Sequence, residues 1–388
     1  MVRLGDICRF QSGGTPAKGE PSYFNGTIPW ITTVALNGSS IDESNAVDWI
    51  TEKAIENSAA KIVPANSVMV GTRVGVGKVA INKVPMSTSQ DVISLLDIDE
   101  NKWSNEFVCK FILGKGTYLN NQARGATIKG IKIETLAGLQ LPDISLEQQC
   151  QIAMLIDNVD KLIALRKEQL AKLDQLVKSR FIELFGDLME NPHSWPIKKI
   201  SDISILLKSG LSRKLLTEDI GLPMIRSCNI QNGQFIYDDI KYWYVDDPQG
   251  AKTSDYILDD GDILINFINS MSQIGKTAIF NDVGRACIYT TNIFRMKLAP
   301  NCNKYYYNWF AMTEYYYRQL QNIIQPAVNQ ASFTTVNFLN LSIPLPPLKL
   351  QEQFATFVEQ TDKSKLAIQQ SLDKLETLKK SLMQEYFG

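Results

Sequence analysis

The chain is poor in the side chains that most often bind metals or carry out acid-base chemistry. His193 is its single histidine, and its six cysteines are scattered without a Cys-x-x-Cys pair. A zinc site therefore lacks its usual ligand spacing, and no disulfide framework is indicated. An apolar leader after Met1 and a stretch of about 18 apolar residues are also missing. We expect a cytoplasmic protein that holds no metal.

An excess of positive charge is absent as well. The formal net charge is −1, whereas domains that hold nucleic acid by bulk electrostatics usually carry a strong basic excess. Any DNA binding must therefore use local patches or charge from a partner. Hydrophobic residues make up 44% of the chain and charged residues 21%, which is typical of a folded protein. Because single cores rarely grow past about 250 residues, a length of 388 residues indicates two domains with accessory helices.

The motifs of DNA enzymes are incomplete. Gly275 to Thr277 resembles the end of a phosphate-binding loop whose leading glycine is missing, so we interpret this segment as a strand end and a turn. The chain has no Asn/Asp-Pro-Pro-aromatic segment to hold a flipped base and no glycine-rich cofactor loop. Residues 191–195 match the base-holding segment only superficially, and no nucleophile with an acidic partner is arranged around His193, so we interpret this segment as a linker. We predict no catalytic residue in this chain.

The chain contains an internal repeat. Residues 142–186, moved forward by 202 positions, fall on residues 344–388. Each copy begins at a proline and ends on Phe-Gly, and these residues mark the start and the stop of a helix. We predict two related helices of about 40 residues, each roughly 60 Å long. Positions that are identical in the two copies include Leu146/Leu348, Gln149/Gln351, Gln151/Gln353, Asp160/Asp362, Lys172/Lys374, Leu176/Leu378, Ser179/Ser381, Glu183/Glu385 and Phe185/Phe387.

Apolar residues in both helices recur at the three-and-four spacing of a coiled-coil seam. A helix of this length is too long to lie flat on one small domain, so pairing the two apolar stripes is the economical way to bury both. The predicted seam consists of Ile152, Leu155, Val159, Leu162, Leu173 and Leu176 in the first helix, and of Phe354, Phe357, Ile368, Leu372, Leu375, Leu378 and Leu382 in the second.

The segments before the two helices diverge more but keep a shared order of features. We predict that one mixed α/β scaffold is used twice, with domains at 1–145 and 187–347 and helices at 146–186 and 348–388. The aromatic run 305–317 has the spacing of a helix packed on a sheet, and we interpret it mainly as core. Shared features are a strand-like lead (7–10 or 203–207), then Pro29-Trp30-Ile31 or Pro223-Met224-Ile225, then an apolar strand ending in Gly77-Lys78 or Gly275-Lys276.

Polar loops with the chemistry of DNA contacts occur in both domains. Glycines let a backbone approach phosphate closely, as expected for Gly13-Gly14 and Gly210, and Arg, Lys, Asn and Gln side chains clamp phosphates or read base edges. Basic stretches follow acidic ones in both copies, which fits a selected surface and also an ordinary solvated face. Candidate contacts are Thr15, Lys18, Arg73, Lys78, Gln90, Arg124 and Lys129 in the first domain, and Lys208, Arg213, Lys214, Arg226, Asn229, Asn266, Lys276, Asn292, Asn329 and Gln330 in the second.

Three further motifs stand at fixed places in this plan. Leu4-Gly5-Asp6-Ile7 precedes Ser12-Gly13-Gly14-Thr15-Pro16, Gly26 precedes Ile28-Pro29-Trp30-Ile31, and Ile343-Pro344-Leu345-Pro346-Pro347-Leu348 leads into Gln351-Glu352-Gln353. With the tandem domain-helix-domain-helix order, the whole chain resembles the specificity subunits of type I restriction-modification systems. The first copy departs from the pattern at Leu141-Pro142-Asp143-Ile144, where the second has the fuller proline-rich form.

The resemblance implies a fold and a set of partners. It implies two target-recognition domains of α/β (α+β) structure that read the halves of a split double-stranded DNA site. The helices would form an antiparallel coiled coil with pseudo-two-fold symmetry that holds the domains apart. Two methyltransferase subunits would bind the helices and methylate adenine N6 with S-adenosylmethionine, and motor-nuclease subunits using ATP and Mg would join for restriction. The chain itself would bind no cofactor.

Two other classes of function stay open from the residues alone. One is a coiled-coil scaffold that binds only proteins, with the polar loops as partner contacts. The other is a self-sufficient DNA enzyme with an unrecognised site. Steep salt dependence of binding favours a DNA reader over a scaffold, and methyl transfer or cleavage by the isolated chain would indicate an enzyme.

Overall fold

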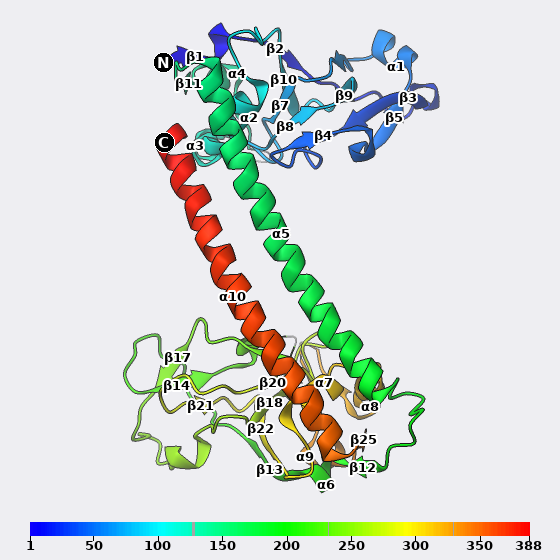
Figure 1. The fold of residues 1–388 in the computed structure, drawn as a ribbon, viewed down its shortest axis with the longest axis vertical. Coiled ribbons are helices and arrows are strands. Elements are labelled where there is room, and N and C mark those ends of the chain that lie inside the picture. The colour runs from blue at the N-terminus through cyan, green and yellow to red at the C-terminus, as the bar shows by residue number, and fades with distance from the viewer. Residues whose placement is uncertain (126–128, 232, 329) are drawn as a thin grey trace. The chain divides into compact units, whose positions relative to one another are not determined.

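The computed structural model describes residues 1–125, 129–231, 233–328 and 330–388, and Figure 1 shows its elements. The chain forms two compact units. Unit 1 contains Met1–Glu168 with Gln369–Gly388, and unit 2 contains Gln169–Ile368. Each unit therefore combines one α/β domain with a segment of each of two long helices, α5 (Leu146–Phe185) and α10 (Leu348–Phe387).

Domain 1 is the α/β part of unit 1, and its two larger sheets have the strand orders β2-β10-β7-β8-β4 and β5-β3-β9-β6. The side chains of strand β7 point alternately into two hydrophobic cores of the domain. Val68 and Val70 pack with helix α2, whereas Met69 faces the core that contains Ile31 and Met86. A strand buried on both faces needs a continuous apolar run, which is what this segment has. The elements are β1 (Val2–Arg3), β2 (Arg9–Ser12), β3 (Phe24–Ile31), β4 (Ser40–Ile41), β5 (Asp48–Ile50), α1 (Glu52–Asn57), β6 (Ile62–Val63), β7 (Val68–Gly71), β8 (Val79–Asn82), β9 (Met86–Thr88), β10 (Val92–Leu96), α2 (Asn105–Gly114), α3 (Gly116–Gln122), α4 (Ile133–Ala137) and β11 (Gln140–Leu141).

Domain 2, the α/β part of unit 2, repeats this plan with the strand orders β13-β22-β18-β20 and β17-β14-β21. In both domains the second sheet joins a strand to its neighbour in parallel, β3 to β9 and β14 to β21. The elements are β12 (Ile197–Lys199), α6 (Ile200–Ile203), β13 (Ser204–Ser209), β14 (Leu222–Ile225), β15 (Ile230–Gln231), β16 (Gln234–Phe235), β17 (Lys241–Trp243), β18 (Ile263–Asn266), β19 (Ile268–Asn269), β20 (Thr277–Ile279), β21 (Ile288–Tyr289), β22 (Ile293–Leu298), α7 (Lys304–Phe310), α8 (Glu314–Ile323), β23 (Gln325–Pro326), β24 (Ala331–Ser332), α9 (Thr335–Leu339) and β25 (Ser342–Pro344).

The repetition extends to single hydrogen bonds. Gly77 N donates to Gly71 O at 3.0 Å in domain 1, and Gly275 N donates to Asn266 O at 2.7 Å in domain 2. Both turn glycines have φ of +79°, a conformation that side chains with a Cβ rarely adopt. The segment that resembles a phosphate-binding loop is therefore a strand end and a turn, as predicted. Two tandem mixed α/β domains, each followed by a long helix, are confirmed.

The aromatic run of domain 2 belongs to the core. Tyr306, Tyr307, Phe310 and Tyr316 are completely buried, and the Phe310 and Tyr316 rings meet edge to face with centroids 5.4 Å apart. Rings enclosed in this way are not available for base stacking. The interpretation of these aromatics as core residues is confirmed.

The two long helices run antiparallel in each unit. In unit 1, Asp160 of α5 pairs with Lys379 of α10 at 2.5 Å, and Lys167 pairs with Glu376 at 3.0 Å. Residue numbers therefore increase along α5 in the direction in which they decrease along α10. In unit 2, Asp174 pairs with Lys365 at 2.6 Å, and the Phe181 and Phe354 rings lie 5.3 Å apart, with the same sense.

Four of the predicted seam residues are exposed. Leu155, Leu162, Leu176 and Leu378 are 41%, 43%, 49% and 46% exposed, so the prediction is wrong there. At two of the four positions the next residue is buried instead, Ile156 after Leu155 and Val177 after Leu176. Adjacent apolar residues repeat with the same heptad period, so spacing alone does not distinguish the two registers. The other predicted seam residues are buried or half-buried: Ile152, Val159, Leu173, Phe354, Phe357, Ile368, Leu372, Leu375 and Leu382.

Candidate nucleic-acid interface

The glycines that follow the first strand of each domain serve the protein's own packing. A Cβ at Gly13 would lie 2.3 Å from the Ser89 carbonyl oxygen, and a Cβ at Gly210 would lie 2.1 Å from the Tyr289 carbonyl oxygen. Such distances are far below van der Waals contact, so only glycine fits. The expectation that these glycines admit a DNA phosphate is corrected: the backbone that approaches them is that of the same domain.

In domain 1, three loops bring candidate contacts together. Thr15, after β2, hydrogen-bonds the Gln90 side chain in the loop between β9 and β10. Asp91 follows Gln90 and lies 3.8 Å from Arg73, in the loop between β7 and β8. Residues far apart in the sequence thus share one polar surface.

This surface continues into a basic pocket. Arg73, Arg124 and Lys132 line it, and reciprocal backbone hydrogen bonds of 3.0 Å join Arg124 to Gly130, the residue after Lys129. Arg124, Lys129 and Lys132 are exposed and make no ion pair within the part of the chain that the structure describes. Free cationic groups of this kind bind phosphate oxygens. We call Arg73, Arg124, Lys129 and Lys132 the basic cluster.

Three lysines of domain 1 differ in their relation to the basic cluster. Lys132 was not among the predicted contacts, although its place in the basic stretch was the available signal. Lys18 and Lys78 are exposed, and no described contact joins them to the basic cluster. The stem of Lys78 lies over Gly75, where an added Cβ would come within 2.9 Å of Lys78 Cδ.

In domain 2, two candidate arginines are engaged by carboxylates of the same domain. Arg213 pairs with Asp247 at 2.6 Å, and this guanidinium holds the pKa of the Asp247 carboxyl well below its usual range. Arg226 pairs with Asp239 at 2.6 Å. Lys208 donates to the Asp255 carbonyl at 3.1 Å and lies over the Tyr256 ring. These cations therefore stabilise loops of domain 2.

Several amide candidates of domain 2 are also structural. Asn229 is 2% exposed and donates to two backbone carbonyls, both at 2.8 Å. Asn266 is completely buried, and the carbonyl of half-buried Asn292 accepts a backbone hydrogen bond of 3.2 Å. Lys214 and Gln330 are exposed. Asn329 lies outside the described residues.

The basic stretch of domain 2 is largely neutralised by the acidic run before it. Arg295 and Asp262 form an enclosed pair at 2.5 Å, although burial raises the pKa of the Asp262 carboxyl. Lys297 pairs with Asp259, and Lys304 lies 3.5 Å from Asp260. Most charges of the basic stretch are therefore paired with the acidic run of the same domain. For domain 2 this favours a solvated or structural role of the basic stretch over a DNA-binding surface.

A polar pocket remains in domain 2 around one predicted contact. Lys276 lines it with Gln231, Asn269 and Gln273, beside Cys228. Amide side chains with one cation can read base edges through paired donors and acceptors. The amides were missed, although Gln273 lies in the loop that carries Lys276 and Asn269 ends the strand just before that loop, and this proximity was the available signal. We call this site the polar pocket.

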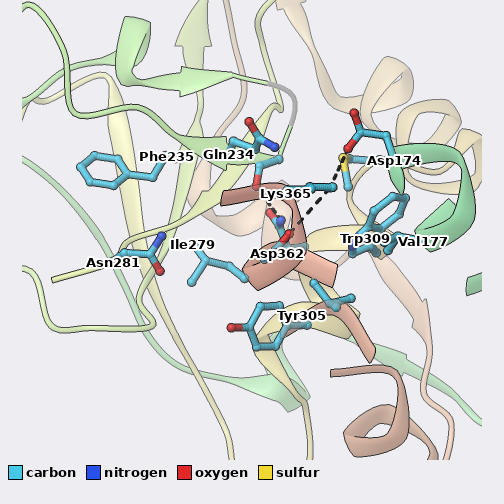
Figure 2. Close-up of a pocket in the computed structure, with 14 residues that line it drawn as sticks. Asp174, Val177, Gln234, Phe235, Ile279, Asn281, Tyr305, Trp309, Asp362 and Lys365 are labelled. Atoms are coloured by element: carbon cyan, nitrogen blue, oxygen red, sulfur yellow. Dashed lines mark hydrogen bonds and ion pairs between the residues drawn. The ribbon is translucent and has the colours of Figure 1, made fainter. Parts of the chain in front are cut away.

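A second pocket of unit 2 has a different character. Figure 2 shows Lys365 between Asp174 and Asp362, with Tyr305 and Trp309 nearby. The Lys365 ammonium lies 2.6 Å from Asp174 and 3.7 Å from Asp362, and burial raises the pKa of Tyr305 to about 12. Two carboxylates and one ammonium give this site a net negative charge, which repels phosphate. This pocket does not suit a DNA backbone.

Comparison with known proteins identifies the family. The family model described as the type I restriction modification DNA specificity domain matches residues 1–175 and again residues 192–379. The chain belongs to this DNA specificity domain family. The two matches correspond to the two domains with their helices, so the internal repeat is a repeat of the family's domain.

Individual members of the DNA specificity domain family are similar at low identity. The MjaVIII type I restriction enzyme specificity subunit of Methanocaldococcus jannaschii is 21% identical over 99% of this chain and 90% of its own length. Three other curated relatives are 28% to 31% identical, but the chain spans only about half of their length (47%, 58% and 46%). A crystal structure of the type I restriction-modification S subunit from M. genitalium matches 100% of this chain and 95% of that chain with a TM-score of 0.61 and 14% identity, which shows the same fold.

Metal-binding clusters and membrane-spanning helices are both absent from the described residues. Within the described residues, no group of three or more His, Cys, Asp or Glu side chains is placed to hold a metal ion. Among the helices of the same residues, none has the length and apolarity needed to cross a membrane.

Proposed function

We propose that the chain is the DNA sequence specificity subunit of a type I restriction-modification complex. Its two domains would read the two halves of a split duplex target. The observation that carries this proposal is the pair of tandem DNA specificity domains, each with its own polar surface, the basic cluster in domain 1 and the polar pocket in domain 2. The chain would have no catalytic residue of its own.

The basic cluster and the polar pocket suit different parts of DNA, the phosphate backbone and the base edges. The basic cluster offers four cations for phosphates, which position a protein on DNA but carry little sequence information. The polar pocket offers mainly amides, which discriminate bases. Because the net charge is −1, affinity would depend on local contacts together with charge supplied by partner subunits.

We propose that two copies of one methyltransferase subunit bind the long helices. Leu176 and Leu378 occupy equivalent positions and are 49% and 46% exposed. Exposed positions are free to diverge, so identical exposed residues in both helices favour one partner bound twice. The identical exposed residues at spacings of four, three and four form one stripe on each helix: Lys172, Leu176, Ser179 and Glu183, and Lys374, Leu378, Ser381 and Glu385.

These partners would supply the chemistry. Methyltransferase subunits would use S-adenosylmethionine to methylate adenine N6, and motor-nuclease subunits would join for restriction with ATP and Mg. This chain would bind none of these cofactors and would select the DNA site.

The test is a map of N6-methyladenine in cells with and without this chain. We expect deletion of the chain to remove methylation at one split motif with a fixed unspecified spacer. An unchanged map in cells that express the methyltransferase would overturn the proposal.

A further inference from the structure

A buried glutamine joins domain 1 to the start of α5. Gln149 is 1% exposed, and its Oε1 accepts a hydrogen bond of 3.0 Å from Ser104 N, where Ser104 caps the N-terminus of α2. Its Nε2 donates to the Lys102 carbonyl at 2.9 Å and to the Ile144 carbonyl at 3.0 Å. One side chain thus connects a loop of the domain, the junction before the helix and the helix itself.

Domain 2 has the same arrangement. Gln351 is completely buried, and its Oε1 accepts from Asn303 N, the N-cap of α7, at 2.8 Å. Its Nε2 donates to the Asn301 carbonyl at 3.2 Å and the Pro346 carbonyl at 2.8 Å. The partners stand at matching offsets in both domains, although the loops that contain them have diverged in sequence.

The hydrogen bonds of the two glutamines are directional, unlike the apolar contacts around them. Ile156 and Phe387 also pack against domain 1, but apolar packing is non-directional and tolerates small slips. Hydrogen bonds to three backbone groups have narrow ranges of distance and angle. A domain held by both kinds of contact therefore takes one orientation on its helix.

We propose that Gln149 and Gln351 are positioning residues that fix the orientation of each recognition domain on the helices, and that they thereby set the spacer length accepted between the two half-sites. This inference rests on the proposed function. One base pair adds about 3.4 Å and about 35° between half-sites. A small rotation or slip of one domain is therefore enough to engage a target with a neighbouring spacer.

The experiment uses the full chain with its methyltransferase partners and the split target found by methylation mapping. Duplexes carry the natural spacer or a spacer one base pair shorter or longer, and dissociation constants are measured for each. The test variants are Gln149→Met and Gln351→Met, which keep the side-chain size and remove the hydrogen bonds. Gln151→Met and Gln353→Met are matched controls, since these glutamines are also identical in both copies but exposed.

We expect the wild type and both controls to prefer the natural spacer. In each test variant that preference should shrink by about tenfold, the equivalent of about one lost hydrogen bond to a buried group. The penalty for a wrong base within a half-site should stay unchanged. Gln149→Leu and Gln351→Leu are the second variants if a methionine variant fails to fold.

Two results would overturn the inference. One is an unchanged spacer preference in a folded test variant. The other is an equal loss of affinity for all three spacers, because this would show that the glutamine maintains the fold of the domain and not its orientation. Absence of any split-target preference in the wild-type complex would instead refute the proposed function, so the two failures are distinguishable.

Discussion

Removal of one cation from the basic cluster should change how DNA binding responds to salt. Arg124→Ala deletes an exposed guanidinium that lines the pocket with Arg73 and Lys132. If Arg124 contacts one phosphate, its loss removes about 0.9 from the slope of log affinity against log salt. The ratio of wild-type to variant affinity should therefore fall by about 3.5-fold between 50 and 200 mM salt, because a fourfold change in salt is raised to the power of about 0.9.

The assay is fluorescence anisotropy of a labelled target duplex bound by the full complex at a series of salt concentrations. Arg318→Ala is the matched control. Arg318 is also exposed but pairs with Glu314 at 2.5 Å, and its substitution changes the net charge equally. We expect this control to keep the wild-type slope.

Equal slopes for Arg124→Ala and Arg318→Ala would refute the reasoning, because only the total charge of the chain would then matter. Substitution of all four residues of the basic cluster should lower the slope by about 3.6, if the four contacts are independent. Failure of the wild-type complex to bind the duplex at every salt concentration would favour a scaffold that binds only proteins.

Three other predictions concern stability and the polar pocket. Phe387→Ala should destabilise unit 1 by about 3–5 kcal/mol in thermal or denaturant unfolding, because it empties a buried aromatic site, whereas Leu378→Ala, at an exposed position, should stay within about 0.5 kcal/mol. The pKa of Asp247 is lowered in the folded protein, so its contribution to stability is present at neutral pH and is lost as the pH falls below about 4. Asp247→Asn should therefore have a lower free energy of unfolding than the wild type at pH 7, and this difference should shrink in acid. A difference that stays constant with pH would contradict a stabilising role of the Arg213–Asp247 pair. Cys228 is exposed and lines the polar pocket, so target DNA should slow its reaction with a maleimide in a Cys150→Ser variant, and an unchanged rate would place the DNA elsewhere.

The fold was predictable because the duplicated helices carry strong local signals. Proline and glycine bound each helix, and the apolar spacing shows that each needs a partner. The exact seam was less predictable. Leu155 and Ile156 offer the same period one residue apart, and only the packing of unit 1 buries Ile156 and exposes Leu155.

The candidate interface was harder to predict, because availability depends on partners that are distant in sequence. Arg213 forms an ion pair with Asp247, and Arg226 forms one with Asp239. No local sequence pattern predicts either ion pair. Arg124 had the same residue type and loop context as those arginines, yet it is exposed. Residue type predicts what a side chain can bind, whereas the tertiary structure decides whether it is already occupied.

The placement of Phe387 in domain 1 also has a consequence for synthesis. Its ring lies 5.4 Å from Phe107 and 5.9 Å from Phe111, so the core of domain 1 is complete only after residue 387 has left the ribosome. The core of domain 2 has its last member at Val358. Domains fold as units during translation, and closing a long loop delays the contacts that depend on it. The domain that is made first should therefore be the last to reach its final packing.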